Sequence, residues 1–184
     1  MKKKLITKGF TLIEMLITIG VFAIVLMVVS SIFININNLQ QNTGNLQRLQ
    51  NEGRYILEKI AKEVRSRELD YQSMNFSSGG LTEQLNFKPD ELGDSMSIVF
   101  NKDTNNIFIT VNNVSETLNS YSVKIENLQF RVFPDYDPFS LMSTSSEVFQ
   151  PRVTIYLKLS NKNVPEKYLK NLELQTTISS KIYK

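Results

Sequence analysis

The chain opens on a long run of apolar positions, and the hydrophobic pattern then changes twice along the sequence. From Phe10 to Ile34 the residues are apolar almost without interruption, and Glu14 is the only charge among them. As a helix these residues would span about 37 Å at ~1.5 Å per residue. That length is enough to cross a hydrocarbon core of roughly 30 Å. The pattern therefore predicts a transmembrane helix over residues 10–34.

Residues 35–69 keep a helical period but are apolar on one side only. The apolar side recurs at steps of mostly three and four positions, at Leu39, Leu46, Leu49, Gly53, Ile56, Ile60 and Val64. This spacing predicts an amphipathic helix that continues the first one and needs cover along one face. Glu58 with Lys62, and Glu63 with Arg67, are spaced for favourable i,i+4 ion pairs.

Two glycines in this second segment predict different things. Gly44 lies in an Asn/Gln-rich patch, where a weak helix former predicts a kink or break near residues 42–45. Gly53 lies on the apolar stripe, where the missing side chain favours close packing against a sheet.

Beyond residue 69 the period becomes that of strands. Alternating or strand-like runs occupy Leu85–Phe87, Met96–Phe100, Ile107–Val111, Ser120–Phe133, Val153–Leu159 and Leu172–Ile182. The alternation changes register at Glu126-Asn127, which predicts a bulge or bend. Because the strands are short and no βαβ rhythm is present, we expect an antiparallel sheet over residues 70–184 whose apolar face covers the helix stripe. The predicted fold class is therefore α+β.

Charge is distributed unevenly along the chain. The formal net charge is +3, from 21 basic and 18 acidic residues. Four lysines precede the apolar run: Lys2, Lys3, Lys4 and Lys8. The remainder is close to neutral, so no nucleic-acid partner is expected. Because basic flanks stay on the cytoplasmic side, the N-terminus is predicted in the cytoplasm and residues 70–184 outside it.

Composition removes several kinds of chemistry. The chain has no histidine, cysteine or tryptophan, so imidazole catalysis, thiolate chemistry and His/Cys metal sites are excluded. No phosphate-binding glycine loop and no nucleophile elbow occur. The sequence thus predicts a protein that is not an enzyme and needs no cofactor.

One acidic loop is a weak calcium candidate. Asp135 and Asp137 stand two positions apart between prolines and offer hard oxygen ligands. The loop fails the EF-hand pattern, because no glycine stands at its sixth position and Ser146 occupies its twelfth. The alternative is a proline-bounded loop with solvated acids.

The junction between the lysines and the apolar run is the most specific signal. Lys8-Gly9-Phe10-Thr11-Leu12-Ile13-Glu14 resembles the processing motif of type IV prepilins and type II secretion pseudopilins. The resemblance implies that residues 1–9 are a leader, cut between Gly9 and Phe10 by a prepilin peptidase that also N-methylates Phe10. A cleaved signal peptide is the competing interpretation, but its apolar stretch would be shorter. A plain signal-anchor helix explains everything except Gly9-Phe10 and Glu14.

The same resemblance gives Glu14 a role in assembly. A lone charge in lipid is costly. In the family this glutamate is thought to pair with the N-terminal amine of a neighbouring subunit, here the amine of Phe10. The alternative is that Glu14 reaches the interface or stays protonated, with no function. Many major pilins carry a proline in this helix and this segment has none, so Gly20 and Ser30-Ser31 are its weak points.

Three further stretches resemble the J-type minor pseudopilins and related minor pilins: Arg54–Ile60, Ile125–Phe130 and Leu174–Ile178. The resemblance implies a minor subunit that primes or caps a pilus or pseudopilus. Its expected partners are other minor and major subunits, an inner-membrane assembly platform and membrane lipid, and its expected location is the inner membrane and then the filament. A major filament subunit and a membrane-tethered binding domain that never polymerises are the alternatives.

Overall fold

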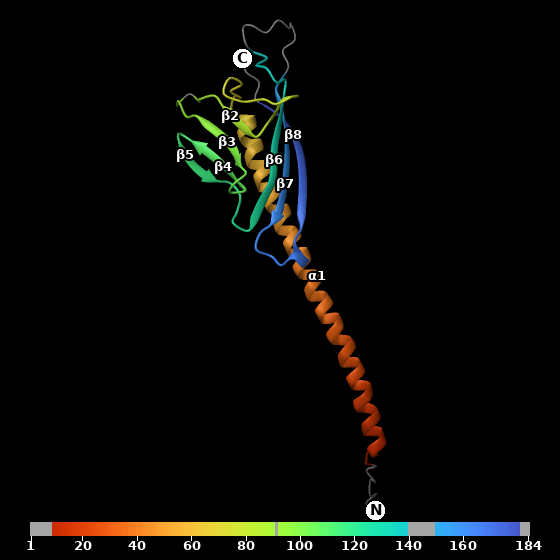
Figure 1. Cartoon of the computed structure of the whole chain (residues 1–184). Coiled ribbons are helices and arrows are strands. Elements are labelled where there is room, and N and C mark those ends of the chain that lie inside the picture. The colour runs from red at the N-terminus through yellow and green to blue at the C-terminus, as the bar shows by residue number, and fades with distance from the viewer. Residues whose placement is uncertain (1–8, 91, 140–149, 181–184) are drawn as a thin grey trace, which may run out of the picture. The chain divides into compact units, whose positions relative to one another are not determined.

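The computed structural model describes residues 9–90, 92–139 and 150–180. The chain divides into two compact units, Met1–Thr43 and Gly44–Lys184. One helix, α1 (Leu12–Ser66, 55 residues), runs from the first unit into the second (Figure 1). Lys2, Lys3, Lys4 and Lys8, with most of the predicted leader, lie outside the described residues.

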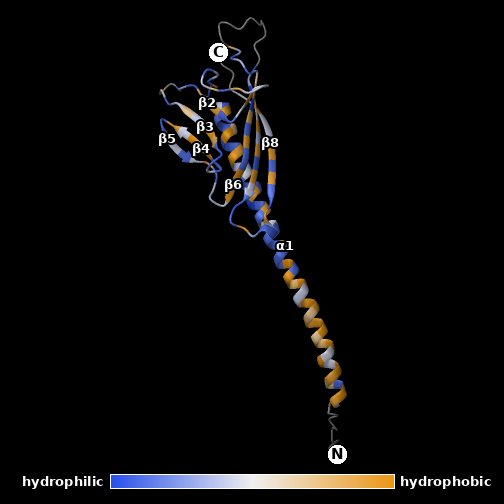
Figure 2. Ribbon diagram, in the orientation of Figure 1, coloured by the Kyte–Doolittle hydropathy of each residue, from blue (hydrophilic) through white to orange (hydrophobic). Residues whose placement is uncertain are grey.

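In the first unit, α1 is apolar on all sides as far as Ile34, with Glu14 as its only charge, and residues 35–43 are mostly polar. Figure 2 shows mostly hydrophobic colour around this part of the helix. Its large apolar side chains are exposed, with Leu16 66% and Phe22 62% accessible. Among the described residues, α1 is the one helix long and apolar enough to cross a membrane. Length and composition therefore agree with the predicted membrane anchor over residues 10–34.

The predicted break near residues 42–45 is wrong. α1 continues through this patch without interruption, and a side chain at Gly44 would meet no heavy atom within 4 Å. A single glycine costs a helix only about 1 kcal/mol relative to alanine. The hydrogen-bonded turns on both sides outweigh that cost, because helix propagation is cooperative.

The part of α1 in the second unit has one buried side. Its buried residues are Leu49, Gly53, Ile56, Ile60, Ala61 and Val64. The predicted stripe is therefore confirmed from Leu49 onward, but it is wrong for Leu39 and Leu46, which are 66% and 37% exposed. The helix ends at Ser66, before the predicted end at residue 69.

Only one of the two predicted ion pairs on the helix is present. Arg67 Nε lies 3.4 Å from Glu63 Oε2, as the i,i+4 spacing predicts. Within the described part of the chain, no ion pair joins Glu58 to Lys62, and both residues are exposed to water.

The strands form two four-stranded antiparallel sheets. The first has the order β1-β6-β7-β8 and the second β2-β3-β4-β5. The first sheet consists of β1 (Leu81–Thr82), β6 (Val123–Phe133), β7 (Arg152–Asn161) and β8 (Asn171–Ser179). The second consists of β2 (Gln84–Phe87), β3 (Met96–Asn101), β4 (Asn106–Val111) and β5 (Val114–Thr117). A short 3-10 helix, η1 (Glu166–Tyr168), precedes β8.

The single predicted sheet is thus corrected to two. The chain changes sheets at Glu83, because Thr82 pairs with Phe130 of β6 while Gln84 pairs with Val99 of β3. All strand pairs are antiparallel, as predicted. The predicted irregularity in the long strand is confirmed by a register shift between Ile125 and Asn127.

Four of the predicted strands match β3, β4, β6 and β7 closely, while β1 and β5 were not expected. β5 follows a two-residue turn in which Asn112 and Asn113 both have positive φ, 50° and 66°. Asparagine tolerates this left-handed conformation, which suits a tight hairpin turn. The last predicted strand ends at Ser179, and Ile182 lies outside the described residues.

The core lies between the buried side of α1 and the inner faces of the sheets. Figure 2 shows the alternation of apolar and polar residues along β6, β7 and β8. Gly53 provides the close approach that its position predicts: an added Cβ would collide with Leu174 Cδ1 and lie 3.4 Å from Leu159 Cδ2. The helix therefore rests directly against β7 and β8 at this glycine.

Candidate processing and assembly site

Gly9 and Phe10 lie just before Thr11, which precedes the first helical residue, Leu12. Both are exposed, and the Phe10 side chain is 82% accessible. Among the described residues, no heavy atom apart from those of its chain neighbours lies within 4 Å of the position that a Cβ of Gly9 would take. The bond between these residues is therefore non-helical backbone that is exposed within the part of the chain the structure describes.

Glu14 is engaged in the first turn of α1 rather than left unpaired. The backbone N–H and the hydroxyl of Thr11 both donate to Glu14 Oε2, each at 2.9 Å. In return the backbone N–H of Glu14 donates to Thr11 Oγ1 at 3.3 Å. Because Leu12 is the first helical residue, Thr11 is the N-cap and Glu14 the third residue of the helix. This reciprocal arrangement is a capping box.

The capping box explains part of why a carboxylate stands here. The first turn of any helix leaves backbone N–H groups without partners, and a negative charge near the N-terminus is favoured by the helix dipole. The family resemblance implies an intersubunit pair for Glu14, with no function as the alternative, and neither interpretation includes this role within the chain. The available signal was the Thr-x-x-Glu spacing just before an apolar run.

Hydroxyl groups inside the apolar half bond back to the helix. Ser30 Oγ donates to the Leu26 carbonyl at 2.8 Å, as expected for this weak point. Thr18 Oγ1 donates to the Glu14 carbonyl at 2.5 Å. These two hydroxyls are thereby satisfied within their own helix, which is the arrangement that lipid requires.

The acidic loop does not assemble a ligand cluster in the part of the chain that the structure describes. There, no group of three or more acidic, histidine or cysteine side chains is placed to hold a metal ion. Asp137 Oδ1 accepts the N–H of Phe139 at 2.9 Å, and its Oδ2 lies 3.9 Å from Lys88 Nζ. Ser146 lies outside the described residues. A calcium site at Asp135 and Asp137 stays a prediction.

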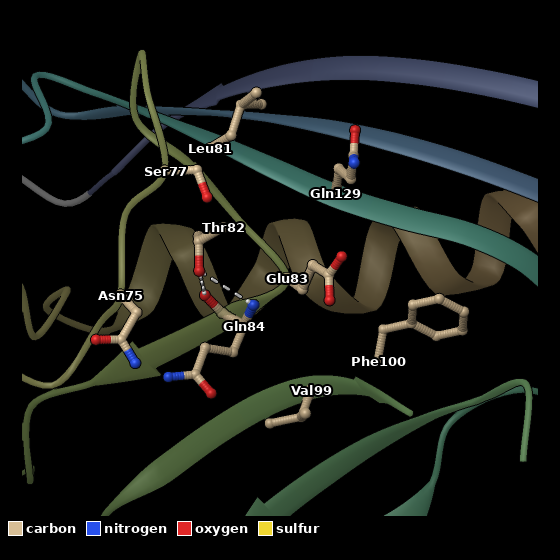
Figure 3. A pocket seen from close by; sticks show the side chains of 9 residues that line it. All are labelled: Asn75, Ser77, Leu81, Thr82, Glu83, Gln84, Val99, Phe100 and Gln129. Carbon is tan, nitrogen blue, oxygen red and sulfur yellow. Dashed lines mark hydrogen bonds between the residues drawn. The ribbon is translucent and has the colours of Figure 1, made fainter. Parts of the chain in front are cut away.

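A polar cavity of about 470 Å³ opens where the chain passes from one sheet to the other. Amides and hydroxyls dominate its lining, and in Figure 3 the side-chain amides of Asn75 and Gln84 point toward each other. Thr82 Oγ1 donates to the Gln84 carbonyl at 3.0 Å. The carboxylate here, Glu83, is paired with Lys102. The lining offers hydrogen bonds but no acid–base pair.

A second polar cluster surrounds the bulge in β6. Ser160 Oγ donates to Glu126 Oε1 at 2.7 Å, and Lys124 Nζ lies 3.1 Å from the same oxygen. The Ser160 hydrogen bond is the main cause that lowers the pKa of Glu126, although partial burial opposes it and Lys124 adds to it. On the neighbouring strands Glu173, 2.7 Å away, raises the pKa of Lys158. This cluster stabilises the sheet and has no reactive geometry.

In a comparison with known protein families, the N-terminal segment matches one family model. Residues 6–30 match the family model described as the prokaryotic N-terminal methylation motif, which is typical of type IV prepilins and pseudopilins. Proteins with this motif are structural subunits rather than enzymes, and the motif implies processing by a prepilin peptidase and assembly with other pilins. No curated protein and no solved structure gave a match to the chain.

Proposed function

We propose that the chain is a minor subunit of a type IV pilus or a type II secretion pseudopilus, and that it primes or caps filament assembly. Prepilin peptidase cuts it between Gly9 and Phe10 and methylates the new amine of Phe10. Residues 10–34 then hold it in the inner membrane, with the sheets outside the cytoplasm, until it joins other subunits through the assembly platform.

One observation carries this proposal. The methylation motif of residues 6–30 coincides with an exposed Gly9-Phe10 bond that lies directly before a helix of exposed apolar side chains. A signal anchor requires only the apolar helix. The motif, the exposed bond and the capped helix start together favour a processed subunit.

Glu14 performs two tasks in this proposal. Its Oε2 holds the Thr11 cap, whereas Oε1 accepts no hydrogen bond from any described residue. The amine of a neighbouring Phe10 bonds Oε1 and leaves the cap in place. Such a pair neutralises two charges that lipid disfavours, so extraction from the membrane becomes conditional on a partner.

The minor, J-type assignment is the finer part of the proposal. It is supported by the resemblance of Arg54–Ile60, Ile125–Phe130 and Leu174–Ile178 to the corresponding stretches of those subunits. In the structure these stretches belong to α1, β6 and β8. A subunit at the tip would use its Phe10 amine toward the subunit below, with no subunit above to engage Glu14.

Mass spectrometry of the N-terminus tests the processing step. In cells with active prepilin peptidase, we expect the chain to begin at a methylated Phe10. Gly9→Val should leave the leader attached, because the branched side chain blocks the approach of the protease. Gly20→Val is the matched control, since Gly20 also has open space around it and lies within the helix. An intact leader on the unsubstituted chain contradicts the proposal.

Two variants of Glu14 separate its two tasks. Glu14→Gln keeps a capping-box side chain and removes the charge, whereas Glu14→Ala removes both. If the charge pairs with an amine, both variants should be cleaved normally and should lose partner subunits from pull-downs to a similar extent. If Glu14→Gln recovers partner subunits at the yield of the unsubstituted chain and only Glu14→Ala loses them, Glu14 acts only as a helix cap.

Copy number separates a minor from a major subunit. In purified filaments we expect a few copies of this chain for each filament, against an excess of another subunit. A preparation dominated by this chain would make it the major subunit instead.

A further inference from the structure

β8 forms one edge of its sheet and offers an open row of backbone groups. It pairs with β7 along its full length, with no register shift, and no strand of the described residues pairs with its other side. It is longer than the other edge strands, since β1, β2 and β5 have two, four and four residues.

The pairing pattern determines which groups point outward. Ser180 N–H donates to the Pro151 carbonyl and Asn161 N–H to the Lys170 carbonyl. Hydrogen-bonded pairs recur every second residue in an antiparallel ladder. The even-numbered residues of β8 therefore bond to β7, and the odd-numbered residues, such as Glu173, Gln175 and Thr177, direct N–H and C=O groups away from it. None of the described residues bonds to these outward groups.

The edge lacks the usual protection against strand addition. Natural edge strands are commonly short, bulged, or interrupted by lysine or proline. β8 contains nine residues, no proline, no lysine and one charge, Glu173. That carboxylate lies 2.7 Å from Lys158, which keeps it on the outer face of the sheet.

A groove of about 280 Å³ runs between this edge and α1. Its floor is apolar and comes from Leu57, Ala61 and Ile178. Arg54 and Arg65, which are the first and last residues of α1 to line it, are both exposed, and no carboxylate lies within ion-pair distance of either among the described residues. The groove thus combines hydrogen-bonding groups, an apolar centre and two cations that have no anionic partner in the described structure.

We propose that β8 and this groove bind an extended segment of a partner protein by strand addition. The segment's side chains that point toward α1 are apolar in the middle and carry a carboxylate at each end. Arg54 and Arg65 bind the two carboxylates, and the outward backbone groups of β8 form a ladder with the segment. In strand addition the ladder supplies affinity and alternate side chains supply specificity.

The spacing of the arginines sets the spacing of the acids. The two arginines are eleven positions apart on the helix, or about 16 Å along the axis at ~1.5 Å per residue. A strand advances ~3.3 Å per residue and returns to the same face every second residue. The two acids therefore stand four or six positions apart, within reach of the long guanidinium side chains. Glu58, between the arginines on the same groove, repels an acid at the middle position and reinforces an apolar residue there.

The site belongs to the Gly44–Lys184 unit and does not depend on processing of the leader. The identification of the partner as another filament subunit rests on the proposed function. The chemistry of the bound segment is independent of that function. Failure of N-terminal cleavage and failure of strand binding are therefore separate results.

A synthetic peptide tests the site with the full chain in detergent micelles. The probe is a fluorescent peptide, Thr-Glu-Thr-Val-Thr-Glu-Thr, whose glutamates and valine share one face. A second peptide carries lysine in place of both glutamates. We expect fluorescence anisotropy to show at least tenfold tighter binding of the glutamate peptide. The double variant Arg54→Glu, Arg65→Glu should reverse this preference, and Glu58→Gln should strengthen binding of the glutamate peptide.

A proline in β8 tests the ladder separately from the charges. Gln175→Pro removes an outward N–H that β7 does not use, and edge strands tolerate such a proline. It should weaken binding at least tenfold with an unchanged circular dichroism spectrum. Thr117→Pro is the matched control, because its N–H faces outward on the other open edge, β5, and peptide binding should not change.

Three results would overturn the proposal: equal binding of both peptides, binding that survives Gln175→Pro, or no binding at millimolar peptide. Self-association of the chain that Gln175→Pro abolishes would assign the edge to a second copy instead, and would overturn the acidic segment as its occupant.

Discussion

Leu16 and Ile60 lie on the same helix and have similar side chains, yet their surroundings differ completely. Ile60 is fully buried by the sheets of its own chain, and Leu16 is 66% exposed. A large apolar side chain gains about 1.5–3 kcal/mol when it is buried. The second half of α1 uses this gain to fold the chain. The apolar side chains of the first half remain exposed in the chain by itself. In the proposed function they are buried by lipid and by other subunits.

The largest expected effect distinguishes these two uses directly. Ile60→Ala should lower the free energy of unfolding of the Gly44–Lys184 unit by about 2–5 kcal/mol, because it leaves a cavity in the core. Ile24→Ala makes the same change on the exposed half and should leave that value unaltered. Denaturant unfolding of both variants in detergent, followed by circular dichroism, measures the difference. Equal losses would show that the apolar half is part of the folded core.

The two glycines of α1 provide the next comparison. Gly53→Val should destabilise the unit by about 1–3 kcal/mol, since the side chain collides with Leu174 and overfills the core. Gly44→Ala meets open space and should stabilise the helix by about 0.5–1 kcal/mol. Thermal unfolding of the two variants checks the opposite signs. A neutral Gly53→Val would mean that β8 moves away from the helix easily.

The capping box should produce a smaller and local effect. Thr11→Val keeps the shape of the side chain, removes its hydroxyl, and should cost the helix start about 1 kcal/mol. Hydrogen exchange of the backbone amides near Glu14 should accelerate, while amides of the second half stay protected. An unchanged exchange rate at Glu14 would show that the box contributes nothing.

The smallest expected effect concerns acid stability. Because the pKa of Glu126 is lowered in the folded chain, its contribution is present above the unfolded pKa of a glutamate. It is lost as pH falls from there through the folded value. Glu126→Gln should therefore be less stable than the unsubstituted chain near neutral pH, and the difference should shrink on acidification below about pH 4. Ser160→Ala removes the main cause of the lowered pKa and should show the same trend. A pH-independent difference would contradict this assignment.

The sequence predicts the elements whose pattern is local. A helical period predicts the stripe from Leu49 to Val64, and a period of two predicts the alternation in β6 and β7. The change of register near Glu126 predicts the bulge. The sequence did not predict β5, because its four residues are all exposed and show no alternation of burial. The signal that remained was the asparagine pair before it, which suits a tight hairpin turn.

The alternation of apolar and polar residues could not predict that the strands divide into two sheets, because the order of strands depends on contacts between residues far apart in the sequence. The same limit hid the open edge of β8: its alternation predicts a strand but not which neighbour it lacks. At the N-terminus, the structure places Gly9 and Phe10 just before the helix and Glu14 in its first turn, whereas their role in processing stays a prediction. The spacing could not show which oxygen of Glu14 is occupied, since one glutamate satisfies both the capping spacing and the prepilin motif.

Site-specific photo-crosslinking tests most directly whether the two halves of α1 are completed by different molecules. Benzoylphenylalanine would replace Phe22, which is 62% exposed in the apolar half, and in a second variant Phe100, which is buried in the sheet unit. In cells that assemble filaments, we expect Phe22 to yield covalent adducts with other pilin subunits and Phe100 to yield only adducts within the chain. Absence of protein adducts at Phe22, with filaments intact, would contradict the claim that this half is reserved for assembly.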